Sequence, residues 1–141
     1  MFASIRRIAD FLLGAEPSLL GAWQRVGDNF SGCRIVVEQT EDGLQGRLVY
    51  VPDRMQNAGW SVGEVKWGRI VRTFGAAYLL QDKQKLFDTR RQAVAGSASC
   101  EARLRFVNNN EITVVPRALD QGSFSRWRRV NASGQSHPHH H

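Results

Sequence analysis

Short runs of strand-forming residues, separated by turn signals, constrain the fold of this chain more than any other feature of its sequence. The run over residues 100–107 is the clearest, because Ala102, Leu104 and Phe106 alternate there with charged residues. Successive side chains of a strand point to opposite faces, so this alternation predicts one face in a core and the other in water. The links between runs are short, as at Asp42-Gly43 and Asn108-Asn109-Asn110, which favours antiparallel hairpins.

The pattern predicts an all-β fold: a single antiparallel up-and-down barrel of eight or nine strands with a short N-terminal helix. The expected strands cover residues 21–27, 33–39, 44–51, 62–72, 76–81, 85–89, 100–107, 111–116 and 123–130. Residues 81–84 are expected to turn, and residues 90–99 to form a loop because small residues dominate them. The side chains expected inside are Leu48, Val65, Leu104 and Phe106, and the alternation of residues 44–50 adds Tyr50 to the inner face.

Residues 1–18 are expected to form a helix and a linker, residues 19–130 the barrel, and residues 131–141 a polar tail. The apolar residues of Met1–Leu13 recur at helical spacing. A signal peptide is the alternative for this segment, but Asp10 interrupts its apolar run. We therefore expect a cytoplasmic location, with the periplasm or secretion as the alternative. The histidines of the tail resemble a purification tag and are left out of the functional reasoning.

The net charge of +6 is unevenly distributed along the 141 residues, which are enough for one domain. Residues 1–64 hold six Lys/Arg and eight Asp/Glu, whereas residues 65–141 hold thirteen and five. A basic half can serve nucleic acid, an acidic partner, an anionic membrane face or an anionic small molecule, or it can be a solvated surface with no partner. No apolar run reaches the length of a membrane span.

The inventory of reactive side chains argues against an enzyme. No His occurs before residue 137, so the fold has no Ser-His or Cys-His pair, and we expect neither a metal site nor a cofactor. The two cysteines, Cys33 and Cys100, are expected to be buried free thiols. A disulfide between them would require their strands to be near neighbours.

Two tryptophan-containing segments bracket the expected barrel. Trp23 lies on the first strand, and Trp127-Arg128-Arg129-Val130 ends the last. We expect Trp23 to be buried at the floor of the barrel against an arginine of the last strand, a cation–π contact worth roughly 0.5–2 kcal/mol.

The chain resembles the bacterial lipocalin-like domains of the calycin group. The resemblance is carried by residues 19–26, 46–53, 101–106 and 127–130, in that order and over about residues 19–130. It implies a barrel with an interior cavity that binds an apolar or amphipathic small molecule. It also implies a structural Trp–Arg pair on Trp23 and Arg129, with Arg128 as the neighbouring alternative for the arginine.

The function expected from these features is non-catalytic binding of an apolar or amphipathic small molecule. The residues expected to line the pocket are Tyr50, Met55, Trp60, Trp67, Arg72, Tyr78 and Phe106. Their rings would bury a flat ligand, and Arg72 would favour an anion if it pointed inward. The alternative is that the rings fill the barrel as core.

Two other classes of function remain open at this stage. Nucleic acid could bind through Arg103, Arg105, Arg126, Arg128 and Arg129, with Trp127 stacking on a base. A protein partner could bind through the same basic face of the late strands. Aromatic rings turned inward around a cavity would favour a small ligand, and aromatic rings on the outer basic face would favour nucleic acid.

Overall fold

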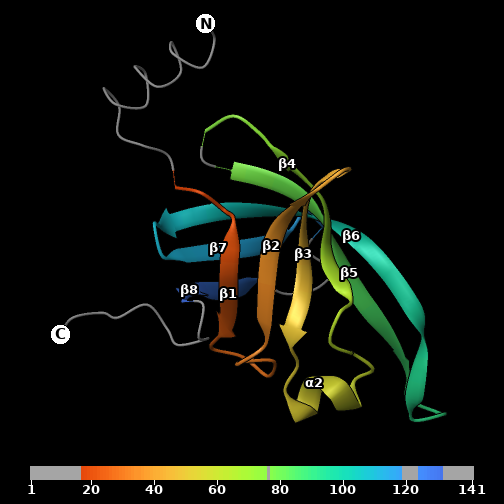
Figure 1. Cartoon of the computed structure of the whole chain (residues 1–141). Coiled ribbons are helices and arrows are strands. Elements are labelled where there is room, and N and C mark those ends of the chain that lie inside the picture. The colour runs from red at the N-terminus through yellow and green to blue at the C-terminus, as the bar shows by residue number, and fades with distance from the viewer. Residues whose placement is uncertain (1–16, 76, 119–123, 132–141) are drawn as a thin grey trace, which may run out of the picture.

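The computed structural model describes residues 17–75, 77–118 and 124–131. These residues form β1 (Gly21–Val26), β2 (Arg34–Thr40), β3 (Gly43–Tyr50), α2 (Asp53–Asn57), β4 (Val65–Arg72), β5 (Ala77–Asp88), β6 (Ala93–Asn108), β7 (Glu111–Pro116) and β8 (Ser125–Val130) (Figure 1). The helix expected over Met1–Leu13 and nearly all of the polar tail lie outside the described residues.

The eight strands close into one barrel in which each strand pairs with the next along the chain. All pairings are antiparallel, and β8 pairs with β1 to complete the ring. The expected all-β, up-and-down barrel is therefore confirmed, with eight strands. Closure leaves no unpaired edge around the ring itself, which is how a small all-β protein protects its backbone hydrogen-bonding groups.

The strand boundaries in the middle of the chain differ from the prediction. Residues 81–84 do not turn, because they continue β5 and pair with residues 98–101 of β6. Residues 93–99 belong to β6, so the predicted loop over 90–99 shrinks to a tight turn. In this turn the Asp88 carboxylate accepts hydrogen bonds from the backbone amides of Arg90 and Arg91 at 2.9 and 3.3 Å. The polar residues of β5 resemble a turn in sequence, but they are held in the strand by ion pairs with residues near β4.

Tyr50 lies on the outer face of the barrel, which contradicts the prediction that it points inward. Leu48 pairs with Ile35 and Tyr50 pairs with Arg34, so Val49 is an extra residue in β3. This β-bulge reverses the alternation after Leu48, and Tyr50 is left half exposed with its ring 5.3 Å from the Arg34 guanidinium. The segment between β3 and β4 contains the short helix α2.

Packed side chains fill the barrel interior. The tryptophans Trp23, Trp67 and Trp127 are fully buried, and the rings of Trp67 and Trp127 meet edge to face at 4.8 Å. Of the four side chains expected inside, Leu48 and Leu104 are fully buried, whereas Val65 and Phe106 are partly buried. A glycine is required at position 46, because a Cβ there would lie 2.9 Å from both Ile35 Cγ2 and Trp67 Cε3.

The contact expected between Trp23 and Arg129 is present at one end of the barrel. The two residues pair across the β1–β8 seam, and the guanidinium lies 4.3 Å from the centre of the indole ring. The guanidinium also donates hydrogen bonds to the carbonyl oxygens of Ser18, Leu20 and Asn109 at 2.6, 3.1 and 3.1 Å. Burial lowers the pKa of Arg129. The arginine therefore ties the start of β1 and the β6–β7 turn to the last strand.

Trp23→Ala should lower the free energy of unfolding by about 3–5 kcal/mol, the range for truncating a large buried ring. The measurement is equilibrium denaturation in urea, followed by circular dichroism. The control is Phe74→Ala, because Phe74 is fully exposed and its loss should stay within about 0.5 kcal/mol. A loss of less than about 1 kcal/mol for Trp23→Ala would show that the seam contact is dispensable.

Candidate functional site

The structure does not bring the seven predicted pocket residues together around one cavity. Met55 and Trp60 are buried at the end of the barrel that α2 covers. Trp67 packs in the interior against Trp127. Tyr50 is on the outer face of the barrel, as described above.

The remaining predicted residues lie toward the end of the barrel where Trp23 and Arg129 meet. The ring of Phe106 is 5.9 Å from that of Trp23 and 6.4 Å from that of Tyr78, so these rings form an aromatic cluster. Arg72 pairs with Tyr78 at the end of β4 and is exposed. The five inner residues of the predicted set, Met55, Trp60, Trp67, Tyr78 and Phe106, all pack in or against one continuous hydrophobic core.

A network of ion pairs stabilises the α2 end of the barrel. The Lys66 side chain is only 3% exposed, and its ammonium donates hydrogen bonds to Asp82 Oδ1 at 2.7 Å and to the Lys83 carbonyl at 2.8 Å. The Glu64 carboxylate accepts hydrogen bonds from Lys83 and Lys85 at 3.0 and 2.6 Å. The Trp60 ring lies 4.7 Å from the Lys66 ammonium and 5.1 Å from that of Lys85.

One hollow at this end, about 290 Å³, is lined by cations that already have anionic partners. Arg25 pairs with Asp28 at 2.8 Å, and Lys66 pairs with Asp82. An incoming anion would have to displace these carboxylates, which is costly for a pair as buried as Lys66 and Asp82. The network therefore closes the barrel end and is a weak candidate for ligand binding.

The Glu64 network gives a testable dependence of stability on pH. Burial alone would raise the pKa of Glu64, but hydrogen bonds from Lys85, Lys83 and the Ser61 amide outweigh it and lower the pKa below its ordinary value of 4.5. Stability from this carboxylate is thus present above the ordinary value and lost as pH falls through the folded-state pKa. Urea unfolding should show a steeper loss of stability for the wild type than for Glu64→Gln below pH 4.5. The exposed control Glu41→Gln should follow the wild type, and identical curves for all three proteins would contradict the role of Glu64.

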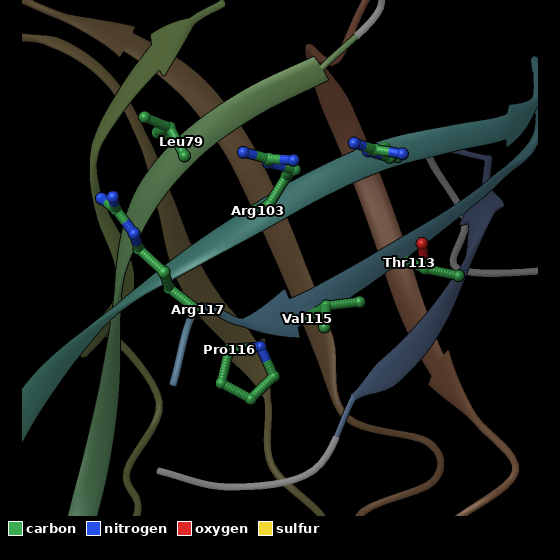
Figure 2. A pocket seen from close by; sticks show the side chains of 7 residues that line it. Leu79, Arg103, Thr113, Val115, Pro116 and Arg117 are labelled. Carbon is green, nitrogen blue, oxygen red and sulfur yellow. The ribbon is translucent and has the colours of Figure 1, made fainter. Parts of the chain in front are cut away.

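A different hollow lies on the outer face of the barrel over β5, β6 and β7. Its volume is about 510 Å³. We call it the basic groove, and it is lined by Leu79, Arg103, Arg105, Thr113, Val115, Pro116 and Arg117 (Figure 2). The strand register explains this set, because Leu79 and Val115 flank Arg103 on either side, and Thr113 lies beside Arg105. Apolar and cationic side chains are thus interleaved on one rigid surface.

The charges of the basic groove are only partly neutralised. Within the described ranges, Arg103 and Arg105 are exposed and form no ion pair with a carboxylate. Arg117 pairs with Glu101 at 2.8 Å on the exposed side of the groove. On the neighbouring strand, Arg126 lies 3.7 Å from Glu111. Two guanidinium groups on one strand therefore remain available to an anion.

Sequence reasoning identified Arg103 and Arg105 as outward-facing cations but missed the apolar wall beside them. Leu79 is on β5, more than twenty residues before the arginines, and Val115 and Pro116 are on β7, the strand that follows them. The only sequence signal for them was their place on the outer face of their own strands. The register between strands, which the sequence does not state, was needed to bring them beside Arg103.

Comparisons with known proteins do not assign the chain to a family: no family model, no curated protein and no solved structure matches it. Among the described residues, no helix has the length and apolar character needed to cross a membrane. In the same part of the chain, His, Cys, Asp and Glu side chains do not gather in groups of three that could hold a metal ion.

Cys33 and Cys100 are buried and do not form a disulfide with each other. Desolvation is the main cause that raises the pKa of Cys33 from 9.0 to about 12, against the opposing effect of Arg25 and Lys66. Burial also raises the pKa of Cys100. Since the thiolate is the nucleophilic form, neither residue is activated for chemistry at neutral pH.

Both cysteines should resist alkylation by iodoacetamide in the folded protein at neutral pH and react completely in denaturant. Mass spectrometry of the unreduced, denatured protein should count two alkylated thiols. Above pH 9.0 the raised pKa of Cys33 costs stability, since the unfolded state ionises first. Labelling of Cys33 in the folded state at neutral pH, at the rate of a free peptide thiol, would contradict this burial.

Proposed function

We propose that the protein is a non-catalytic, lipocalin-like binding protein that holds a small anionic, amphipathic molecule in the basic groove. The observation that carries this proposal is the pair Arg103 and Arg105, which face an apolar wall and form no ion pair with a carboxylate in the described part of the chain. The sequence resemblance supports the small-molecule class, and the packed interior favours the outer surface as the binding place.

The geometry of the groove suits an anion with an apolar body. Alternate residues of a strand lie about 6.6–6.8 Å apart on one face, so the two guanidinium groups can hold one large anionic group or two small ones. A guanidinium can donate two parallel hydrogen bonds to a carboxylate, sulfonate or phosphate. Leu79, Val115 and Pro116 would cover the apolar part of the ligand. The volume of about 510 Å³ lies in the usual range for small-molecule sites.

The chemistry of the side chains supports a role without catalysis. The chain has no His before residue 137, and both thiols are buried with raised pKa values. Nucleic acid is less well supported than a small anion. Trp127, the ring that would stack on a base, is fully buried in the core.

The test is a fluorescence titration with anilinonaphthalene sulfonate, followed by competition with fatty acids and with retinoid-like and flavonoid-like carboxylates. The double variant Arg103→Ala/Arg105→Ala should bind at least about tenfold more weakly, since each charge-assisted hydrogen bond contributes about 1.5–3 kcal/mol. The matched control is Arg90→Ala/Arg91→Ala, which removes the same charge from the exposed β5–β6 turn and should bind like the wild type.

Two results would overturn the proposal. Equal weakening by both double variants would show that only the overall charge attracts the probe. Binding that is lost in Trp67→Phe with the fold intact, but kept in Arg103→Ala/Arg105→Ala, would place the site in the interior. The titration is repeated with a short single-stranded oligonucleotide. If the protein binds it more tightly than any of the small anions, nucleic acid is favoured as the ligand.

A further inference from the structure

Part of the β5–β6 hairpin extends beyond the barrel. In the described residues, the pairing of β4 with β5 ends at Asp82, and the pairing of β7 with β6 ends at Ala102. One further hydrogen bond runs from the Arg117 backbone amide to the Glu101 carbonyl. Beyond these positions, and among residues 17–75, 77–118 and 124–131, β5 and β6 pair only with each other. We call this part the hairpin arm, residues 83–88 and 93–99, and Figure 1 shows it reaching past α2.

One side of the hairpin arm is anchored to the barrel. Lys83 and Lys85 pair with Glu64, which precedes β4. Val94 packs on the backbone of Gly59, where a Cβ would lie only 2.3 Å from Val94 Cγ2. The lysines anchor β5 and Val94 anchors the start of β6, so these contacts fix the direction of the arm. The β6 strand forms the opposite edge of the arm.

The β6 edge of the arm lacks the charges and prolines that usually protect an exposed strand. Residues 93–99 are all exposed, and the sequence Ala-Val-Ala-Gly-Ser-Ala-Ser holds neither a charge nor a proline. Its one irregularity is a register shift that leaves Ala95 without a partner on β5. Monomeric proteins usually block such edges with charges, prolines, β-bulges or very short strands, because an open edge pairs with other chains. Of these, the run 93–99 has the bulge at Ala95. A ribbon of two strands is also marginally stable alone.

We propose that the β6 edge pairs antiparallel with the same edge of a second copy of this chain, across a two-fold axis. An antiparallel strand is complementary to itself under this symmetry, and the product is a four-stranded sheet in the order β5–β6–β6–β5. Of the apolar side chains of the arm, Val94, 37% exposed, is on the strand that forms the new junction, whereas Leu86 and Phe87, 50% and 47% exposed, are on β5, one strand away from it.

The charge distribution makes this edge the place where a second copy can approach. The protein has a net charge of +6, so two copies repel each other over much of their surface. The uncharged run 93–99 is a place where two copies can meet without bringing like charges together. The basic groove lies on the outer face of the barrel, over the parts of β5, β6 and β7 that belong to the closed ring. Residues 93–99 do not line it, so it stays open in the dimer.

The test measures the mass of the full chain in solution by light scattering and by sedimentation equilibrium over a wide range of concentrations. The wild type should dimerise, and Ala98→Lys should weaken the association by about tenfold or more, because it introduces a charge at the edge. The matched control is Thr89→Lys, which adds the same charge in the exposed β5–β6 turn and should dimerise like the wild type.

Hydrogen exchange of the wild type tests the proposal without a variant. Backbone amides of residues 93–99 that point away from β5 should exchange more slowly as the protein concentration rises. A wild type that is monomeric at every concentration overturns the proposal, as does a dimer whose edge amides stay unprotected. Equal weakening by Ala98→Lys and Thr89→Lys also overturns it. The groove variant Arg103→Ala/Arg105→Ala should dimerise normally, so failure of ligand binding and failure of dimerisation are separable.

Discussion

Closure of the barrel depends on the contact between the Arg129 guanidinium and the Trp23 ring. The ring provides a large apolar surface in the seam between the first and last strands, and the guanidinium covers it at 4.3 Å. The cation is satisfied by three backbone carbonyls, which come from the approach to β1 and from the β6–β7 turn. Burial of a cation is costly unless its donors are bonded, so each of these carbonyls has to be in place for the seam to be stable.

The way the interior is filled determines where recognition can occur. Three tryptophans occupy the inside of a ring of eight strands, and such a ring is just wide enough to be filled by side chains. Gly46 leaves the space that Trp67 takes up. With the interior packed and the α2 end closed by the pairs of Lys66 and Glu64, the exposed cations and open apolar surfaces are on the outside of the barrel. The barrel then serves as a rigid support on which β5, β6 and β7 present the basic groove.

Local sequence predicted what depends on local alternation. The inward residues Leu48 and Leu104, the turns at Asp42-Gly43 and at Asn108-Asn109-Asn110, and the contact between Trp23 and Arg129 could all be predicted from the chain. The position of Tyr50 could not, because one bulge residue in β3 reverses the alternation without changing its composition. The course of β5 through residues 81–84 was also missed. The partners that keep these polar residues in a strand are Lys66, on β4, and Glu64, just before β4. The basic groove depends on the register between three strands, so only its arginines could be anticipated.

The seam has a consequence for the order in which the protein folds during synthesis. Arg129 bonds to the Ser18 carbonyl, a partner 111 positions earlier in the chain. The first strand therefore leaves the ribosome long before the strand that completes its pairing, and its edge stays open until residue 129 follows. Contacts so distant in sequence slow folding, because the entropy of closing the whole loop is lost before the contact contributes. The ring thus stays incomplete until β8 has been made, and until then the edge of β1 that pairs with β8 is open.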